Sequence, residues 1–308
     1  MFMDFPLISL LTPCYNSASF IHRLLDSVLA QDYPLVEMYV VDDGSTDDTR
    51  QVVLSYVPLF GQKGYTLEYV YQVHAGQSEA INKGLKLVHG KFLAWPDSDD
   101  CYATADALSL LGAALEGSDE TVSMVRCLPS YVDEAGQPWH GYRLGGFDKE
   151  DLFEDCLLWE NGFWCLSGGY MVKMELLDRY IPQRTISTAL HAGQNWQLML
   201  PLLHGHRCLT LQKQLYEVMI RENSHSRGQY QTSAALLRKN RDFEYVLVRT
   251  LENMVQLSQE EKRAYIRKVR RKYRKANRDL WWKSHFPIVQ FKQGIKWILR
   301  FFHVGIKG

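Results

Sequence analysis

Several short patterns that mark common protein classes are missing from this 308-residue chain. Its six cysteines form no Cys-x-x-Cys pair and have no histidine pair at zinc spacing, which favours reduced thiols over a zinc site or a disulfide framework. Asp4 and Pro6 interrupt the N-terminus, so we expect no signal peptide. No run approaches the ~20 apolar residues that span a bilayer. No Gly-x-Gly-x-x-Gly follows an expected strand, which argues against a dinucleotide oxidoreductase.

The chain also lacks a net charge, because 35 basic residues balance 35 acidic ones. The two signs are unevenly placed. Residues 262–308 hold 15 Lys and Arg but one acid, Asp279, so the preceding chain is strongly acidic. A hydrophobic content of 46% at this length supports one substantial core with an appendage.

Short apolar segments alternate with helical patterns in the first hundred residues. Strands are expected at 7–11, 38–41, 67–71 and 91–95, with helices between them. This order predicts an α/β fold with a mostly parallel, Rossmann-like sheet flanked by helices. Ligands of such sheets bind beyond the carboxyl ends of the strands. The polar residues that follow these strands are therefore expected to share one crevice.

Two acidic stretches lie at these strand ends. Asp42 and Asp43 follow the second strand, and Asp97, Asp99 and Asp100 follow the fourth. Crowded carboxylates repel one another unless a positive group lies among them. A divalent cation that also binds phosphate oxygens would meet this need, because Mg²⁺-type ions prefer oxygen ligands. The pattern indicates nucleoside-diphosphate chemistry.

Four motifs in order resemble those of glycosyltransferase family 2. They are TPCYN at 12–16, VVDDGSTDDT at 40–49, the segment 76–84 and WPDSDD at 95–100. The resemblance covers roughly residues 5–225 and implies an inverting enzyme of the GT-A fold that uses a nucleotide-sugar, here expected to be a UDP-sugar. It implies a domain over 1–228, with a nucleotide-binding half at 1–105 and an acceptor half at 106–228. Residues 229–308 are expected to form a basic amphipathic helical extension.

The resemblance places the nucleotide on residues of these motifs. The side chain of Asp43 is expected to accept the ring N–H of a uracil, because a base without that donor would leave a buried acceptor unpaired. Tyr15 either stacks on the base or is a half-buried aromatic near a helix start. Asp42 is read as a turn cap. The full set of expected nucleotide-binding residues is Thr12, Tyr15, Asn16, Asp43, His74, Gln77, Asn82, Asp97 and Ser98.

Asp97-Ser98-Asp99 has the DXD arrangement. Residues i and i+2 of an extended segment point to one side, so Asp97 and Asp99 can reach one Mn²⁺ or Mg²⁺ ion on the diphosphate. Asp100 binds a water of the metal, orients its neighbours or caps the next helix. His225 is expected to ligate the metal or touch the diphosphate, and the alternative is a polar loop. Arg221 and Arg227 would suit phosphate oxygens.

The general base is the point where the chain departs from the family pattern. The family commonly has an acidic residue at the start of the helix after the acceptor loop, whereas this chain has Gln194 and Asn195. Neither amide can take a proton; Asn195 either bonds the acceptor or caps the helix. His191 could serve near neutral pH, although a loop histidine is often only solvated. Asp155 and Glu160 are further candidates, so the base stays unassigned.

The basic tail reads as nearly continuous helix from about residue 233, broken at Pro287. Apolar stripes run through 265–276 and 288–302, among lysines, arginines and tryptophans. This composition favours contact of 262–308 with an anionic membrane, and the alternative is docking on the acidic domain. No nucleic-acid motif accompanies the charge, so we expect no nucleic-acid partner. A peripheral location on the inner, cytoplasmic face of the membrane would follow.

The sequence thus predicts a metal-dependent glycosyltransferase. It would move a sugar to a saccharide or lipid-linked saccharide acceptor in surface polysaccharide synthesis. The alternative, motivated by Gln194 and Asn195, is a catalytically inactive scaffold that binds the sugar nucleotide.

Overall fold

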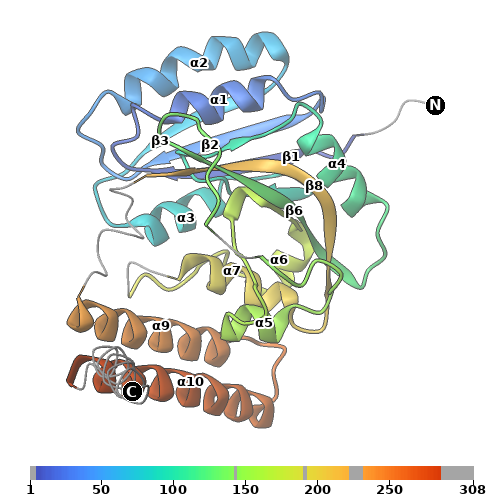
Figure 1. Ribbon diagram of the computed structural model, residues 1–308. Coiled ribbons are helices and arrows are strands. Elements are labelled where there is room, and N and C mark those ends of the chain that lie inside the picture. The colour runs from blue at the N-terminus through green and yellow to red at the C-terminus, as the bar shows by residue number, and fades with distance from the viewer. Residues whose placement is uncertain (1–4, 142–143, 190–192, 222–231, 286–308) are drawn as a thin grey trace, which may run out of the picture.

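A computed structural model describes residues 5–141, 144–189, 193–221 and 232–285 of the chain (Figure 1). Within these residues one sheet of eight strands has the order β3-β2-β1-β4-β7-β6-β8-β5. The strands are β1 (Ile8–Cys14), β2 (Val36–Asp42), β3 (Thr66–Tyr71), β4 (Phe92–Ala94), β5 (Cys101–Tyr102), β6 (Val122–Asp133), β7 (Tyr170–Lys173) and β8 (Arg207–Ile220).

The first half of the sheet is parallel, as the sequence predicts. β1 pairs in parallel with β2 and β4, and β2 with β3. Every residue of β1 and β2 is buried, which explains why both strands are mostly apolar. β7 pairs antiparallel with β4 and β6, and β5 pairs antiparallel with β8, so the complete sheet is mixed.

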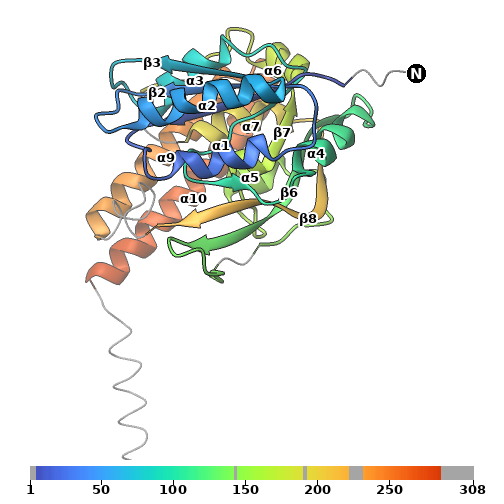
Figure 2. The ribbon, with the colours of Figure 1, turned by 90° about the horizontal axis from the view of Figure 1, so that it is seen from above.

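Helices cover both faces of the sheet. They are α1 (Ile21–Leu29), α2 (Thr49–Lys63), α3 (Gln77–Leu85), α4 (Ala107–Glu116), α5 (Phe153–Leu158), α6 (Met174–Tyr180), α7 (Gln194–Leu203), α9 (Ser233–Asn253) and α10 (Gln259–His285), with a short 3₁₀ turn at Ser167–Gly169. One core cluster contains α1, α2 and α4, and a second contains α3, α5, α6 and α7. Figures 1 and 2 show α1 and α2 on one side of the sheet, and Figure 1 shows them over β1 to β3. The predicted α/β sheet flanked by helices is confirmed.

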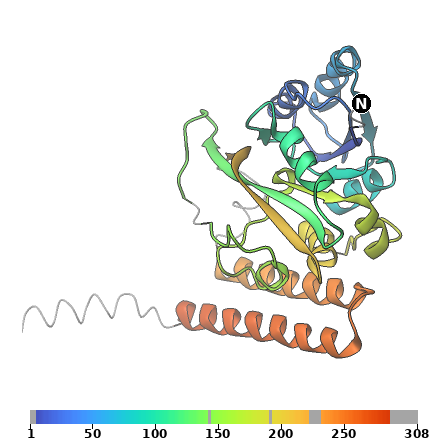
Figure 3. The same ribbon diagram turned by 90° about the vertical axis from the view of Figure 1, so that its right-hand side faces the viewer.

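The tail differs from the expected continuous helix. α9 ends at Asn253, and α10 begins after Ser258, so the two helices run side by side as a hairpin beneath α5 and α7 (Figures 1 and 3). A capping box causes this break: Ser258 Oγ accepts from Glu261 N at 3.2 Å, and Glu261 Oε2 accepts from Ser258 N at 2.8 Å. The Ser-x-x-Glu pattern was the sequence signal for it. The expected break at Pro287 and the stripe at 288–302 lie outside the described residues.

The helical extension shares the hydrophobic core of the sheet and its covering helices. Leu247, Leu251, Val269 and Tyr273 are buried in the same cluster as α5 and α7. The stripe on α10 therefore docks on the protein, which was the alternative reading for this part of the tail. In the described part of the chain, no helix is both long and apolar enough to cross a membrane.

Candidate active site

The loops after β1 and β2 are bound to each other through Asn16. Its side-chain Oδ1 accepts from Thr46 N at 2.8 Å, and its backbone N donates to Ser45 Oγ at 2.8 Å. Asn16 has φ of 50°, a left-handed conformation that asparagine tolerates better than most residues. In this structure Asn16 joins the first two motifs and shapes the edge on which a ligand would lie.

Asp43 is buried and its carboxylate is fully engaged by the loop after β3. One oxygen accepts from Ala75 N at 2.8 Å and from Gln72 Nε2 at 2.7 Å. The other accepts from Gly76 N at 2.8 Å and lies 2.9 Å from His74 Nδ1. An ionised carboxylate offers about four acceptor positions. A base N–H would therefore have to take the place of the Gln72 or His74 side chain.

Asp42 has a structural role. One oxygen of its buried carboxylate accepts from Ser45 N at 2.8 Å, and the other accepts from the Tyr69 hydroxyl at 2.6 Å. The first bond closes a turn of the kind that aspartate forms with the backbone of following residues. The adjacent Gly44 has φ of 81°, and a Cβ there would lie 2.7 Å from His74 N, so this turn approaches the His74 loop closely.

Tyr15 and His74 form an exposed pair of rings. Their centroids lie 4.6 Å apart at an interplanar angle of 33°, and Tyr15 is 48% exposed. The two residues come from loops after β1 and β3, on either side of Asp43. Such a surface suits a planar base, because aromatic rings favour offset stacking at this separation.

Three other expected nucleotide-binding residues have different environments. Thr12 is fully buried and its Oγ1 has no hydrogen-bond partner among the described residues. Asn82 is buried and fixes the loop after α6, donating to Ile186 O at 2.9 Å and accepting from Ile186 N at 2.7 Å. Gln77 is exposed at the first residue of α3. Among these three, Gln77 is the one whose side chain is exposed to a ligand.

Asp97 follows β4 in a crowded electrostatic environment. Its carboxylate accepts from Ser167 Oγ at 2.8 Å, which links the DXD loop to the acceptor half. Burial and the charge of Asp99 raise the pKa of Asp97 to about 6, against the smaller opposing effect of the Ser167 bond. The hydroxyl oxygens of Ser98 and Ser17 lie 2.9 Å apart, so the DXD loop also touches the residue that follows the first motif.

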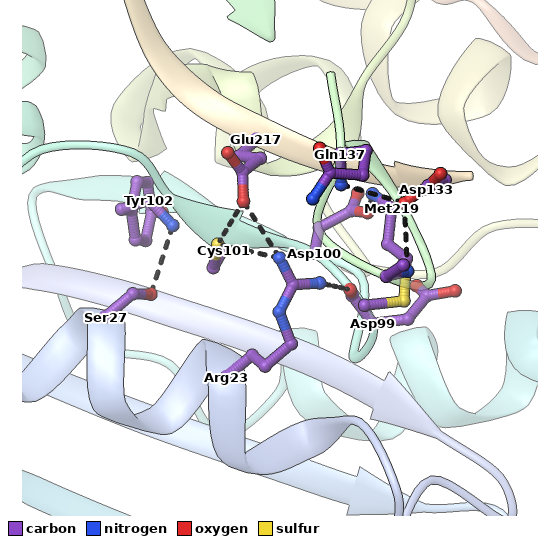
Figure 4. Close-up of polar contacts among 11 residues, drawn as sticks. Arg23, Ser27, Asp99, Asp100, Cys101, Tyr102, Asp133, Gln137, Glu217 and Met219 are labelled. Atoms are coloured by element: carbon purple, nitrogen blue, oxygen red, sulfur yellow. Dashed lines mark hydrogen bonds and ion pairs between the residues drawn. The ribbon is translucent and has the colours of Figure 1, made fainter. Parts of the chain in front are cut away.

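Asp99 is paired with an arginine. The guanidinium of Arg221 donates twice to one oxygen of Asp99, with an Nε–Oδ2 distance of 2.8 Å, and stacks on the Phe20 ring at 4.3 Å. Arg23 of α1 braces the same loop, donating to the Asp99 carbonyl at 3.1 Å and to Glu217 at 2.9 Å (Figure 4). No local sequence pattern joins these arginines to Asp99.

Asp100 is turned toward β8 rather than toward solvent. Its carboxylate accepts from Met219 N at 3.1 Å, as Figure 4 shows, and the residue is buried. Burial, with the charges of Asp99 and Asp97, raises the pKa of Asp100 well above the usual range. Asp100 therefore ties the DXD loop to the sheet.

A divalent cation fits the chemistry of this loop. The described residues contain no cluster of three or more His, Cys, Asp or Glu arranged to hold a metal ion. Asp97 and Asp99 supply two carboxylates close enough for one to raise the pKa of the other. Mg²⁺-type ions are commonly bound by one or two carboxylates with substrate phosphates and waters. His225, the expected third ligand, and Arg227 lie outside the described residues.

Asn195 lies at the start of α7, and its side chain is hydrogen-bonded to Trp95, which precedes the DXD loop. Its Oδ1 accepts from the buried Trp95 indole N–H at 2.8 Å, and Trp95 lies two residues before Asp97.

Among the base candidates, Asp155 is buried and accepts from Lys149 at 2.7 Å and from Asn161 at 2.8 Å, so it holds its own loop together. Glu160 is exposed. His191 lies outside the described residues.

Several curated relatives match about a third of the chain. An uncharacterised glycosyltransferase of Rickettsia prowazekii is 39% identical over 97 residues, which cover 32% of this chain and 28% of the relative. A putative teichuronic acid biosynthesis glycosyltransferase of Bacillus subtilis, TuaG, is 38% identical over 96 residues, covering 31% and 36%. The match therefore spans about a third of these relatives or less.

Solved structures and a family profile extend the comparison. S. aureus TarS 1–349 in complex with UDP-GlcNAc has a TM-score of 0.66 at 20% identity, covering 91% of this chain and 76% of that one. A mannosyltransferase of Pyrobaculum calidifontis with GDP-Man and Mn²⁺ has a TM-score of 0.54 at 23% identity, covering 83% and 66%. These likenesses establish the fold. The profile of glycosyl transferase family 2 matches residues 9–169, and the chain belongs to this family.

Proposed function

We propose that the protein is a metal-dependent inverting glycosyltransferase that uses a UDP-sugar. One observation carries the proposal. The Tyr15–His74 ring pair, Asp43 and the Asp97–Asp99 loop all follow neighbouring parallel strands and lie at one edge of the sheet. This is the edge where open α/β sheets bind ligands.

The donor would lie along this edge. Tyr15 would stack on the base, and Asp43 would accept the base N–H once the His74 or Gln72 side chain moves aside. UDP is the preferred nucleotide because a uracil has that ring donor and because TarS, a structural neighbour, has been solved with UDP and with UDP-GlcNAc. Gln77, which is exposed at the start of α3, would contact the donor. The loops around the donor would be shaped by Thr12, Asn16, Asn82 and Ser98.

Asp97 and Asp99 would hold Mn²⁺ or Mg²⁺. Such an ion, when bound, neutralises negative charge that builds up on the leaving diphosphate. In the structure Arg221 forms an ion pair with Asp99. A guanidinium binds phosphate oxygens as well as it binds a carboxylate. Arg221 would therefore move from the carboxylate to the diphosphate when the donor binds.

The reaction would be a single displacement at the anomeric carbon. An acceptor hydroxyl attacks this carbon, the bond to the diphosphate breaks, and the hydroxyl proton passes to a base. Asn195 cannot accept that proton and would orient the acceptor instead. Of the proposed bases in the described residues, Glu160 is exposed, whereas Asp155 is committed to Lys149 and Asn161.

The acceptor is proposed to be a saccharide or lipid-linked saccharide of a surface polysaccharide. The relative TuaG is named for teichuronic acid biosynthesis, which supports this class. Contact between 262–308 and the inner face of an anionic membrane would bring the enzyme to such an acceptor. Trp281 and Trp282, near the end of α10, are 45% and 48% exposed among basic residues, as expected of an interfacial segment.

A catalytically inactive sugar-nucleotide scaffold is the second candidate, favoured by the amides at Gln194 and Asn195. Thermal-shift titration with UDP, with and without Mn²⁺, tests the donor site, and UDP release from a panel of UDP-sugars separates the candidates. Stabilisation by UDP that needs Mn²⁺ and is lost in Asp99→Ala supports the metal role. Metal-dependent binding without UDP release on any donor would favour the scaffold.

A further inference from the structure

The segment after α5 holds a tryptophan in an unusual backbone conformation. Trp159 has φ of 47° and ψ of 57°, and Asn161 and Gly162 also have positive φ. A bulky residue in the left-handed region is an outlier that persists only when its surroundings fix it, and such positions cluster at functional sites. The ring of Trp159 is nevertheless 48% exposed. The fold thus maintains a strained backbone to present a large apolar ring to solvent.

Packing holds this ring in place from beneath. Its edge-to-face partners are Phe163, at a centroid distance of 5.7 Å, and Trp196 of α7, at 5.5 Å. Asp155 anchors the following turn by accepting from Asn161, and Gly145 N donates to Gly162 O at 3.1 Å. A Cβ on Gly162 would lie 2.5 Å from Gly145 N, so the two loops are in close backbone contact.

The basic tail helix also supports the segment. Lys272 Nζ of α10 donates to Leu158 O, the residue before Trp159, and Lys268 pairs with Glu154 at 2.6 Å. The position of Trp159 therefore depends on elements from three parts of the chain. An exposed ring with such support loses little conformational entropy when a ligand binds.

Short contacts connect Trp159 to the candidate active site. Trp196, its ring partner, follows Asn195, which accepts from Trp95 at 2.8 Å, and Trp95 lies two residues before Asp97. Further along the chain from Trp159, Ser167 donates a hydrogen bond to Asp97 of the DXD loop. Trp159 is thus linked, through the buried ring of Trp196, to the start of α7, where Asn195 lies.

We propose that Trp159 is a stacking platform for a pyranose ring of the acceptor, an inference that rests on the proposed function. One face of a pyranose presents C–H bonds that bury well on an aromatic ring, while its hydroxyls stay at the rim for hydrogen bonds. Binding sites for small molecules combine such apolar surfaces with a few polar groups. Glu160, the next residue in the chain, is exposed and adds a polar group to the same loop.

Saturation-transfer NMR on the full chain with UDP and the diamagnetic ion Mg²⁺ tests the platform. The probes are methyl glycosides of glucose, galactose and N-acetylglucosamine. Wild type should transfer saturation to the C–H protons of at least one glycoside. Trp159→Ala should weaken that binding about tenfold, the scale expected for lost aromatic contact, and Trp159→Phe should retain part of it. Tyr245→Ala, which removes a 45%-exposed ring of α9, should have no effect.

Trp159→Gly separates the platform from a packing role. Glycine tolerates the left-handed backbone, so this variant should keep its fold and its UDP-dependent thermal shift while losing the glycoside signal. Glycoside binding that is unchanged in folded Trp159→Ala overturns the proposal. UDP binding by wild type without binding of any glycoside also overturns it, but leaves the proposed function standing. Failure of UDP and Mn²⁺ to bind would instead count against the proposed function.

Discussion

Arg221 donates twice to the carboxylate of Asp99, at the site where the DXD loop would hold a cation. The two side chains are 24% and 19% exposed, so the pair is only partly screened by water. A positive side chain and a metal ion would compete for the same carboxylate. This competition would give the donor site two charge states, one with Arg221 on Asp99 and one with a metal ion there.

Replacing Arg221 with methionine should therefore strengthen metal binding and weaken nucleotide binding. Without nucleotide, the affinity for Mn²⁺ should rise about three- to tenfold, since one competing charge is removed. The affinity for UDP with Mn²⁺ should fall, because a phosphate ligand is lost. Titration with Mn²⁺ followed by electron paramagnetic resonance measures the Mn²⁺ affinity, and calorimetry measures the UDP affinity. Arg249→Met on α9 is the control, and a fall in Mn²⁺ affinity in Arg221→Met would contradict the competition.

The pKa of Asp97 predicts how stability depends on pH. Its pKa is raised to about 6 in the folded protein, so the folded state binds the Asp97 proton more tightly than the unfolded state does. The protonated carboxyl therefore contributes to the free energy of unfolding below about pH 4, and this contribution is lost as pH rises through about 6. Without metal, Asp97→Asn should have a higher Tm than wild type at pH 7.5 and no advantage at pH 4.5. Thermal unfolding across this range measures the difference. Asp106→Asn, at an acid whose side chain is 46% exposed, should show no such pH-dependent difference in Tm.

The same protonation should limit donor binding. A proton on Asp97 competes with the metal, so the Tm increase caused by Mn²⁺ and UDP should be largest above pH 7 and shrink below pH 6. Ser167→Ala should move this loss to higher pH, because the Ser167 bond lowers the pKa of Asp97. A Tm increase that is constant from pH 5 to 8 would argue against Asp97 as a metal ligand.

The Trp95–Asn195 bond makes a separate prediction. Asn195→Ala leaves a buried indole N–H without its acceptor and should cost about 1–3 kcal/mol in the free energy of unfolding. Asn195→Asp keeps an acceptor for Trp95 and adds a carboxylate at the acceptor side. If this position can host the base, sugar transfer should increase in Asn195→Asp. Unfolding titrations and UDP release measure the two effects; full stability in Asn195→Ala would contradict the structural role of the bond.

Two truncations separate the roles of the tail. Deleting 280–308 should release the protein from anionic vesicles and leave Tm nearly unchanged, because the buried Val269 and Tyr273 remain. Deleting 259–308 removes those side chains from the core and should lower Tm strongly. Vesicle co-sedimentation and thermal unfolding provide the readouts. Retention on vesicles after the shorter deletion would refute membrane contact through this segment.

Local patterns predicted the strands of the donor half and the loops that follow them. Apolar runs fixed β1 and β2, and the position of Asp42 before Gly44 and Ser45 predicted a turn that the structure contains. The contacts of Asp99 with Arg221 and Arg23 could not be predicted, because they join residues more than 70 positions apart and depend on packing. The break between α9 and α10 had a local signal in Ser258 and Glu261, whereas the burial of Val269 depended on the tertiary fold.

The most direct measurement of the central claim is UDP release from UDP-sugars by the full-length protein, with Mn²⁺ or with EDTA, in wild type and Asp99→Ala. We predict release by wild type with Mn²⁺, and at least a hundredfold loss with EDTA or in Asp99→Ala, on the order expected when charge stabilisation in a transition state is removed. Equal release by Asp99→Ala, or release that does not depend on Mn²⁺, would contradict the account.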